Sequence, residues 1–377
     1  MASPTGRILT VNAGSSSLKL RILDAENQVI SSRDSGSLRG QEELHNELAA
    51  ILAEGGAIDA AGHRVVHGGP DHDGPAVLDA SVEEELERLA DLAPLHNPPA
   101  LEAIRALEAE LPGLANVACF DTTFHADMPA AASTYAVPAA WSARWPLRRY
   151  GFHGLSHAYA SRRAAELLGR PAAELRLVTA HLGAGASLAA VKGGRSVDTT
   201  MGFTPLEGLV MATRSGSVDP GLLLWVQRRG EIDAEEMERA LDRESGLLGL
   251  SGRSADMREV IAAADEGDER SRLAFDVYIH RLAGAIASMA AAMEGIDALV
   301  FTGGVGENSA RVRAAAADAM AFLGVELDPH LNGEAKGDAL LSDAGAAVPV
   351  IVALAREDLE IAAQVRAALA RPRKRSA

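Results

Sequence analysis

The sequence predicts an α/β protein of two lobes, each built on a mixed β-sheet flanked by helices. Short apolar segments with strand character alternate along the chain with longer segments of helical periodicity. Residues 7–23 and 175–191 share a further pattern, in which two apolar strands flank a turn of small residues. The two segments lie nearly half a chain apart, and 377 residues exceed what one small core needs. We therefore interpret them as an internal duplication, with one hairpin opening each lobe.

The other elements follow from apolar periodicity and from the residues at element ends. Residues 81–93 predict a helix with Ser81 as its N-cap, and residues 98–111 predict a helix that begins at a proline. Further helices are expected at 154–168, 233–243, 271–294, 309–322 and 357–370. Strands are expected at 62–67, 116–120, 175–180, 298–303 and 348–353. Clusters of Gly, Pro and Asp predict loops at 67–75 and 328–338.

No low-complexity linker marks the boundary between the lobes. We expect the last helix to fold back on the first lobe, which would then comprise residues 1–125 plus 358–377, and the second lobe to comprise residues 126–357. The longest apolar stretch, 282–293, is too short to span a bilayer and is expected to be a packed helix. The first residues, MASPTGR, lack the pattern of a signal peptide.

The composition is that of an ordinary folded protein with an aliphatic core, because hydrophobic residues make up 47% of the chain and aromatic residues only 4%. A net charge of −16 leaves no broad basic face for duplex nucleic acid. A few backbone N–H groups and arginines can still make a local positive site on an acidic protein. The one cysteine, Cys119, cannot form an internal disulfide and is expected to be a buried thiol, which fits a reducing cytoplasm.

Three glycine-rich turns follow apolar strands, at 12–19, 181–187 and 301–309. Backbone N–H groups and serine hydroxyls in such turns suit an anion, and ligands of open α/β sheets bind at strand ends. Each turn alone is weak support, because Ser-rich hairpins are usually only turns. Gly304 and Gly306 are not followed by the third glycine of the dinucleotide fingerprint, which counts against a nicotinamide cofactor. Together the three turns, split between the two lobes, favour a nucleotide held across a cleft.

Polar residues cluster in loops beside apolar strands at five places. Arg64 and His67 lie at the end of one strand, and Asp121 directly follows another. The other clusters contain His96 between prolines, His153 with His157 beside two glycines, and Arg214 in a Gly- and Ser-rich loop. A single residue of this kind is more often structural. Five such clusters indicate a functional site, because loops on a rigid scaffold commonly carry function.

The motifs of this chain resemble, in order, those of the acetate kinase family: NAGSSSLK, RVVHGG, APLHNPP, FDTTFH, YGFHGLSH, HLGAG, VDTTMGFTPLEGL, TRSGSVDPG, SGLLGLSG, FTGGVGENS and REDLEIA. The resemblance covers residues 7–366, and YGFHGLSH with MGFTPLEGL is its most specific part. That family belongs to the acetate and sugar kinase, heat-shock chaperone and actin superfamily. The resemblance therefore implies a duplicated, two-lobed ribonuclease H-like (actin-like ATPase) fold. It also implies reversible phosphoryl transfer between ATP and acetate with Mg²⁺ or Mn²⁺, and a homodimer formed through the second lobe, which holds the nucleotide.

The resemblance assigns roles to individual residues. It implies that Asn12 and Glu357 are the magnesium-associated positions and that Lys19 contacts the nucleotide. The remaining catalytic positions are Arg64 for the substrate, Arg214 beside the transferring phosphoryl group, His153 as transition-state stabiliser and Asp121 as the essential aspartate. The methyl group of acetate is expected to meet Val66, Leu95, Phe152 and Pro205. The ATP-contacting positions are His181, Leu182, Gly183, Ala184, Gly185, Asp256, Met257, Arg258, Gly304, Val305, Gly306, Glu307 and Asn308.

A carboxylate nucleophile has no proton to lose at neutral pH, so the reaction requires no general base. We therefore expect Asp121 to orient an arginine or a metal-bound water, and we expect direct in-line transfer without a covalent enzyme intermediate. The chain departs from the family pattern at Ala184, where an asparagine is usual, and mildly at residues 256–258 and Arg356. The stretch 24–62 is also shorter than is typical. A propionate or butyrate kinase, and a non-catalytic nucleotide-binding switch of the same superfamily, remain alternative interpretations.

Overall fold

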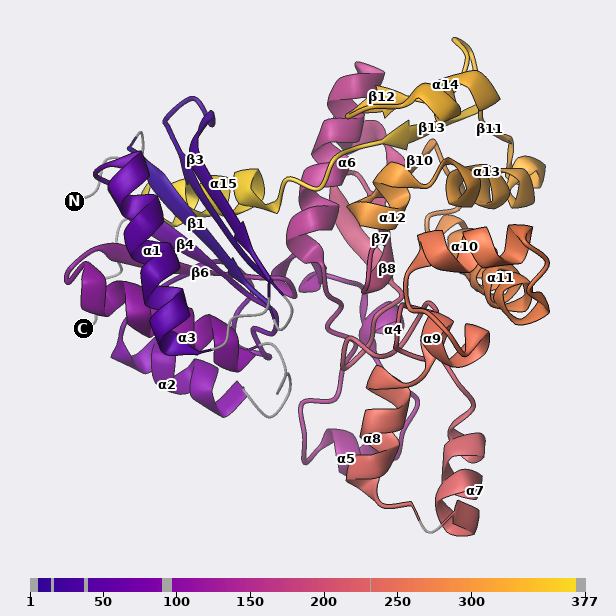
Figure 1. Cartoon of the computed structure of the whole chain (residues 1–377), viewed down its shortest axis with the longest axis horizontal. Helices are drawn as coiled ribbons and strands as arrows, with labels where there is room; N and C mark the ends of the chain where they lie inside the picture. The colour runs from indigo at the N-terminus through magenta and orange to yellow at the C-terminus, as the bar shows by residue number, and fades with distance from the viewer. Residues whose placement is uncertain (1–5, 15–16, 37–39, 90–96, 231, 371–377) are drawn as a thin grey trace. The chain divides into compact units, whose positions relative to one another are not determined.

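The computed structural model describes residues 6–14, 17–36, 40–89, 97–230 and 232–370. The chain forms two units. The first contains residues 1–126, 153–155 and 356–377, and the second contains residues 127–152 and 156–355. The last helix therefore belongs with the N-terminal part of the chain. Each unit has its own sheet and its own helices (Figure 1).

The sheet of the first unit has the strand order β3-β2-β1-β4-β6-β5. Strands β1 (Ile8–Ala13), β2 (Leu18–Leu23) and β3 (Val29–Ser35) form an antiparallel meander. Strands β4 (Ala60–Val65) and β6 (Ala115–Phe120) run parallel to β1, and the short β5 (Ala76–Val77) closes the edge. The hairpin predicted at 7–23 is confirmed as β1 and β2, with Asn12 opposite Lys19.

Helices cover both faces of this sheet. Successive side chains of β1 point to opposite faces, so each face contributes to a separate core. Leu9 and Val11 share a core with α1 (Gln41–Gly55) and α3 (Asn97–Glu110), and α2 (Ala80–Arg88) packs against α3. Ile8 lies in the core formed with α15 (Glu357–Ala370) on the other face. Gly62 allows α15 to approach closely, since a Cβ there would lie 2.5 Å from methyl carbons of Ile361 and Val365. The even-numbered residues of β1, Asn12 among them, therefore face the side of α15.

The sheet of the second unit has the order β11-β13-β10-β7-β8-β9, with β12 paired to β13. Strands β7 (Arg176–Leu182), β8 (Ala186–Lys192) and β9 (Arg195–Thr199) are antiparallel, and β10 (Ala298–Thr302) and β13 (Val348–Val352) continue the sheet parallel to β7. Two short strands, β11 (Val325–Glu326) and β12 (Ala339–Leu340), complete it. The second predicted hairpin is confirmed as β7 and β8.

The two sheets repeat one topology. The order β3-β2-β1-β4-β6 in the first corresponds to β9-β8-β7-β10-β13 in the second, with the same strand directions. In both, a meander is followed by two strands parallel to its first strand. The duplicated, actin-like α/β fold is therefore confirmed, and the carboxyl ends of three parallel strands meet at one edge of each sheet.

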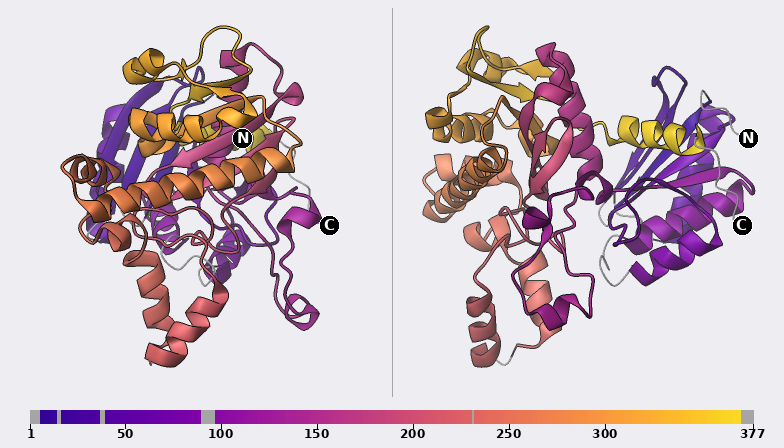
Figure 2. Two further views of the ribbon diagram at one scale, coloured as in Figure 1. Left: turned by 90° about the vertical axis from the view of Figure 1, so that its right-hand side faces the viewer. Right: turned by 180° about the vertical axis from the view of Figure 1, so that it is seen from behind.

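Helix α6 (Gly154–Leu168) covers one face of the second sheet, and α11 (Glu269–Ala292) packs against β7, β8 and β9 on the other, as Figure 2 shows. Short helices fill the connections of this unit: α4 (Ala130–Ser133), α5 (Ala139–Ser142), α9 (Gly246–Ser251), α10 (Met257–Asp265), α12 (Gly303–Asn308), α13 (Ala310–Ala319) and α14 (Pro329–Glu334). Single 3₁₀ turns lie at Thr123–His125, Ala172–Glu174 and Ala321–Leu323. Helices α7 (Pro220–Gly230) and α8 (Ala234–Arg243) bury none of their side chains within this chain.

The structure corrects several predictions of local structure. The N-cap of α2 is Asp79, whose carboxylate accepts from the N–H groups of Ser81 and Val82. The predicted turn at 301–309 contains a helix, α12, and the predicted loop at 328–338 contains α14, which Asp328 caps. The predicted helix 309–322 ends earlier, because α13 stops at Ala319 and a 3₁₀ turn follows.

Two expectations about apolar segments are confirmed. Cys119 is fully buried on β6, and burial raises the pKa of its thiol. Residues 282–292 of this stretch lie within α11, which buries Leu282, Ile286 and Met289, and Met293 is the C-cap of the helix. Within the described part of the chain, no helix has both the length and the apolar character that crossing a bilayer requires.

Candidate functional site

In the first unit, polar side chains gather at the carboxyl ends of the parallel strands β1, β4 and β6. Asn12 lies near the end of β1, Arg64 near the end of β4, and Asp121 directly after β6. The registers place Val11 beside His63 and Arg64 beside Cys119, so these positions are neighbours across the sheet. Ligands of open α/β sheets bind at this edge.

Arg64 and Asp121 form a buried, forked ion pair at the centre of this group. Arg64 Nη2 and Nε donate to Asp121 Oδ2 at 2.6 and 3.1 Å, and the Asp121 side chain is inaccessible to solvent. Burial raises the pKa of Asp121, and the adjacent guanidinium opposes that rise. Burial by itself would lower the pKa of Arg64, but the charges of Asp121 and Glu357 outweigh it, so this pKa is raised. A permanently charged, oriented guanidinium results.

Asn12 and Glu357 complete this cluster. Asn12 accepts from Arg64 Nη1 at 3.1 Å through Oδ1 and donates from Nδ2 to Glu357 Oε2 at 2.7 Å. Glu357 is the first residue of α15, and its Oε2 lies 3.7 Å from Arg64 Nη1. Carboxylate and amide oxygens are ligands that Mg²⁺ accepts, and Glu357 and Asn12 bring one group of each type to this cluster. The described residues contain no group of three or more His, Cys, Asp and Glu side chains placed to bind a metal directly.

The segment 153–155 connects the specific motif YGFHGLSH to this cluster. The Gly154 N–H donates to the carbonyl of Asp121 at 2.9 Å, and the backbone of His153 hydrogen-bonds the Asp121 carboxylate. A Cβ on Gly154 would lie 2.1 Å from the carbonyl oxygen of Asp121, so only glycine fits there. His153 itself has a left-handed backbone with φ of 56°. A strained histidine is therefore held one residue from a required glycine, next to Asp121.

The other predicted residues of the first unit are less constrained. Lys19 is exposed on β2, directly opposite Asn12 in the hairpin register. Val66 is buried after β4. The Gly14 N–H, which was expected to face an anion, instead donates to the carbonyl of Ser17 within the turn at 2.8 Å. Leu95 and His96 lie outside the described residues.

In the second unit, the turn 181–185 closes the β7–β8 hairpin. Its Gly183 N–H donates to the carbonyl of Gly185 at 2.9 Å, so this N–H group is also used within the turn. The Ala184 side chain is exposed, and its carbonyl accepts from the Ala212 N–H at 3.1 Å. Leu182 is fully buried, which leaves only its backbone for any ligand.

Helix α12 lies directly beside this turn. A Cβ on Gly303 would meet the carbonyl oxygen of Leu182 at 2.8 Å, and the positive φ of 77° at Gly303 also requires glycine. Glu307 does not point away from the protein, because its Oε1 accepts from the N–H groups of Gly303 and Ala355 at 3.0 and 2.8 Å. The buried Arg313 donates to the carbonyls of Gly306 and Glu307 at 2.9 and 2.7 Å, which favours the last turn of the helix. The fold thus fixes α12 at both ends and leaves Gly304 and Asn308 exposed.

The predicted nucleotide segment 256–258 is the start of α10. Asp256 caps this helix through the Arg258 N–H at 2.8 Å, and Arg258 pairs with the same carboxylate. Met257 is buried, so its side chain belongs to the core.

Arg214 lies in a loop that returns to the 181–185 turn, since Ala212 contacts Ala184. Its Nε donates to Asp242 Oδ1 at 3.0 Å and its Nη1 lies 3.4 Å from the carbonyl of Pro205. Pro205 belongs to the loop 200–208, which a second network holds. Tyr135 and Arg149 both donate to Glu207, at 2.6 and 2.7 Å. Phe152 is buried in the same unit.

Several of these supporting residues have no recognisable signal in the sequence. Asp242 and Tyr135 lie in segments that carry no motif, and Arg313 lies in an Ala-rich helix. Glu207 and Ser156, whose Oγ lies 2.8 Å from His181 Nδ1, lie inside quoted motifs, where spacing alone gives no partner for them. The structure is needed to show that each holds a predicted site residue or its loop.

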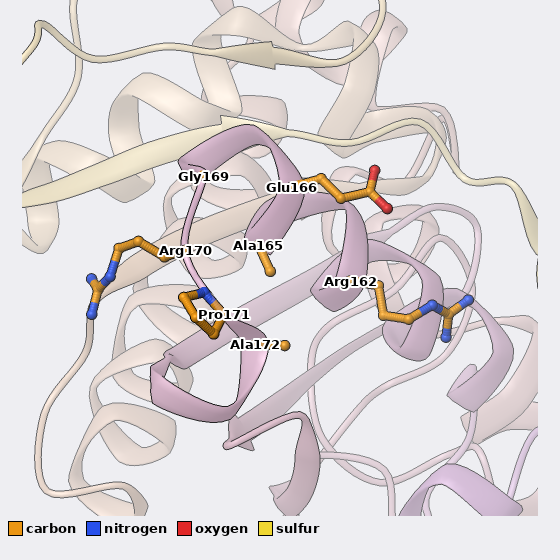
Figure 3. A pocket seen from close by; sticks show the side chains of 7 residues that line it. All are labelled: Arg162, Ala165, Glu166, Gly169, Arg170, Pro171 and Ala172. Atoms are coloured by element: carbon orange, nitrogen blue, oxygen red, sulfur yellow. The ribbon is translucent and has the colours of Figure 1, made fainter.

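A shallow pocket of about 470 Å³ lies elsewhere, at the C-terminal end of α6, and is lined by Arg162, Ala165, Glu166, Gly169, Arg170, Pro171 and Ala172. In Figure 3 the Arg170 side chain extends to one side while those of Arg162 and Glu166 extend to the other, so the charged groups do not converge. None of the predicted site residues lines it.

Comparisons with known proteins show the family to which the chain belongs. The sequence profile of the Acetokinase family matches residues 40–363. An acetate kinase of a Synechococcus strain is 52% identical over 313 residues, which cover 83% of this chain and 77% of the relative. The crystal structure of Porphyromonas gingivalis acetate kinase has a TM-score of 0.88 at 36% identity and covers 96% of this chain and 99% of its own. A propionate kinase from Francisella tularensis has a TM-score of 0.87 at 35% identity, with 95% and 98% covered. The chain belongs to the Acetokinase family.

Proposed function

We propose that this chain transfers the γ-phosphoryl group of ATP reversibly to acetate, giving acetyl phosphate and ADP. Family membership supports the reaction. The observation in the structure that carries the proposal is the Arg64 guanidinium, which Asp121 and Asn12 hold at the carboxyl ends of three parallel strands. Such a fixed cation suits a small carboxylate.

The chemical step requires little covalent help from the protein. A carboxylate oxygen of acetate attacks the γ-phosphorus, the bond from that phosphorus to the β,γ-bridging oxygen breaks, and ADP leaves with the electron pair. Because both reactants are anions, the main task is positioning and neutralising charge. Arg64 binds the carboxylate, and Asp121 orients Arg64 and takes no proton from the substrate.

The second unit supplies the nucleotide contacts in this proposal. The turn 181–185, the exposed residues of α12 and the segment 256–258 bind ATP. Arg214, held on Asp242, stabilises the charge on the transferring phosphoryl group. His153 donates a hydrogen bond to an oxygen of that group, and its fixed backbone supports this role.

Asn12 and Glu357 would hold the magnesium ion, directly or through its waters. The ion supplies charge neutralisation to the ATP phosphates when bound. Two hydrogen bonds, to Arg64 and Glu357, orient Asn12 for this role.

The acyl group defines the second candidate function. The propionate kinase from Francisella tularensis matches this chain about as well as the acetate kinase structure does. We assign acetate because the family profile and the curated relatives, among them the Synechococcus protein at 52% identity, are those of acetate kinases. An additional methylene changes such recognition by only about 1–3 kcal/mol, so propionate should react more slowly but measurably.

A hydroxamate assay for acyl phosphate with acetate, propionate and butyrate tests this assignment. Acetate should have the highest kcat/KM. A higher value for propionate would make the chain a propionate kinase, and equal efficiency with butyrate would contradict a small pocket. ATP binding without any acyl phosphate would support the non-catalytic alternative.

Arg214→Ala provides the matched test of the site. Removal of a preorganised donor costs on the order of 100- to 1000-fold in turnover. The control is Arg239→Ala, because Arg239 pairs with Glu244 through an exposed ion pair on the same unit. Equal turnover in the two variants would refute the role of Arg214.

We also propose that the chain forms a cytoplasmic homodimer through the second unit. Leu222, Leu224 and Trp225 of α7 are 49%, 57% and 54% exposed, although large apolar side chains of this kind are usually covered. Trp225→Glu should shift the protein toward a monomer in light scattering coupled to size-exclusion chromatography, whereas Leu273→Glu on α11 serves as the exposed apolar control.

A further inference from the structure

Two neighbouring parallel strands of the second sheet, β10 and β13, lead into segments with different destinations. Strand β10 continues into α12, whose exposed residues are the proposed nucleotide contacts. Strand β13 continues into residues 353–355, the last of the second unit, and the chain then enters the first unit at Arg356, directly before α15. The register pairs Phe301 with Val352, so the two strands end side by side.

One carboxylate oxygen joins the two segments that follow these strands. Glu307 Oε1 accepts from the Gly303 N–H at 3.0 Å and from the Ala355 N–H at 2.8 Å. Gly303 is the first residue of α12, and Ala355 is the last residue of the second unit. Hydrogen bonds to an ionised carboxylate are stronger than those to a neutral acceptor. Because both bonds converge on one oxygen, a shift of α12 weakens one of them unless Ala355 moves with the helix.

The segment that follows β13 is held at each of its three N–H groups. The Ala353 N–H donates to the Phe301 carbonyl at 2.9 Å and so extends the pairing of β13 with β10. The Leu354 N–H donates at 2.7 Å to Oδ1 of Asp338, which directly precedes β12. The third bond, to Glu307, is the one of the three whose acceptor lies on α12. This bond therefore makes the end of the segment depend on the position of that helix.

Glu307 is suited to positioning α12 and not to binding the nucleotide itself. Its negative carboxylate repels the phosphates of ATP, which carry charge of the same sign. The carboxylate also occupies the Gly303 N–H, a donor at the start of the helix that an anion would otherwise use. The exposed residues Gly304 and Asn308 are left for contact with the nucleotide.

We propose that Glu307 is a positioning residue that couples nucleotide binding on α12 to residues 353–355. A nucleotide that holds α12 also holds Glu307, and Glu307 then holds Ala355. The chain leads from there into α15, whose first residue, Glu357, we assign to the metal. The proposal rests on the nucleotide role of α12 in the proposed function.

Hydrogen exchange measured by mass spectrometry on the full-length protein tests this coupling. Saturating MgADP should slow exchange of the wild-type peptide that contains residues 353–356 about 3- to 10-fold, because it holds α12 in place. Unchanged exchange of this peptide with MgADP bound would overturn the proposal, even if the variants below failed to fold. A wild-type protein that binds no MgADP would instead refute the nucleotide role of α12, and with it the proposed function.

Glu307→Ala removes the shared acceptor. Its dissociation constant for MgADP should rise about 3- to 10-fold, and MgADP at a saturating concentration should no longer slow exchange of the peptide. Glu307→Gln keeps an acceptor oxygen for the same two N–H groups and should restore both the affinity and the effect on exchange. A variant Glu307→Gln that behaves like Glu307→Ala would refute a role through these two hydrogen bonds.

Asp338→Ala is the matched control. It removes the other carboxylate from the segment, the acceptor of the Leu354 N–H, and leaves α12 with all its bonds. Exchange of the peptide should become faster, MgADP should still slow it, and the dissociation constant for MgADP should stay within about twofold of wild type. An equal loss of MgADP affinity in Asp338→Ala and Glu307→Ala would refute the coupling, because general loosening of the segment would then explain both.

Discussion

Asn12 Nδ2 donates a hydrogen bond to Glu357 Oε2 across 2.7 Å and so joins the first strand of the chain to the start of its last helix. The two residues are 345 positions apart in the sequence. Arg64 contacts both of them, at 3.1 Å from Asn12 Oδ1 and 3.7 Å from Glu357 Oε2. The hydrogen bond between Asn12 and Glu357 therefore places an amide and a carboxylate beside Arg64, the residue that we propose binds the substrate.

Glu357→Gln should raise the magnesium concentration for half-maximal activity about 10- to 100-fold, the usual effect of removing a supporting metal partner. The reason is the loss of negative charge while the side-chain shape is kept. Asp358→Asn is the control, because the neighbouring Asp358 pairs with Arg356 at 2.8 Å. A magnesium titration of acyl phosphate formation measures the effect, and unchanged dependence in Glu357→Gln would remove this residue from the metal site.

Asp121→Asn should lower kcat/KM for acetate on the order of 100- to 1000-fold, because the amide no longer fixes the Arg64 guanidinium. It should also destabilise the first unit by about 3–5 kcal/mol, since it leaves a buried cation without its partner. Urea denaturation separates the two effects.

The control for the Asp121–Arg64 ion pair is Asp34→Asn. Asp34 also makes a forked pair, with Arg21 at 2.6 and 2.8 Å on the same sheet, but its side chain is 60% exposed. Exposed pairs contribute about 0–1 kcal/mol, so stability and activity should both stay near wild type. An equal loss of stability in the two variants would contradict the importance of burial.

His153→Asn should separate the chemical role of this residue from its backbone role. Asparagine tolerates the left-handed conformation that His153 adopts, whereas alanine does so less well. We expect His153→Asn to keep near wild-type stability and to lose turnover on the order of 100-fold or more. Turnover close to wild type in a folded His153→Asn protein would show that the imidazole has no part in catalysis.

Ala184→Asn should lower the KM for ATP about 3- to 10-fold, because it adds a side-chain amide to the turn 181–185. Ala184 is exposed, so the larger side chain can be accommodated. Ala184→Leu is the control of similar size without hydrogen-bonding atoms and should not lower the KM. If the two variants have the same KM for ATP, the side-chain amide does not improve nucleotide binding at this turn.

The stability of the first unit should fall as the pH drops below about 6.5. Burial lowers the pKa of His63 in the folded protein from 6.5 to about 4, so below pH 6.5 the unfolded chain binds a proton that the folded chain does not. Between pH 7 and pH 5 this difference in proton binding lowers the free energy of unfolding by about 2 kcal/mol. His63→Gln removes the titration and retains a donor for Asn116 Oδ1, which lies 2.9 Å from His63 Nε2.

Urea denaturation at pH 7 and pH 5 measures this effect. Over this interval the free energy of unfolding of the wild-type protein should fall by about 2 kcal/mol more than that of His63→Gln. His45→Gln, on the partly exposed face of α1, is the matched control and should follow the wild type. Equal losses in all three proteins would show that His63 does not control the acid sensitivity.

The sequence by itself determined the fold class, the duplication and the identity of the principal polar residues. Alternating apolar segments are local signals, and both hairpins appeared where the periodicity predicted them. Asp121 and Arg64 could be singled out because each is a charged residue beside apolar strand residues in the sequence. The family resemblance was carried by contiguous motifs, which are also local.

Only the tertiary structure decided how these residues are held. The partners Asn12 and Glu357, Arg214 and Asp242, and Ser156 and His181 are brought together by strand order and helix packing, which act over many residues. Local reasoning also failed at α12, where a glycine-rich segment forms a helix because Glu307 and Arg313 bond to its two ends. Glycine lowers helix propensity by only about 1 kcal/mol, and these hydrogen bonds offset that cost, together with the one that Glu307 accepts from Ala355, 48 positions further along the chain.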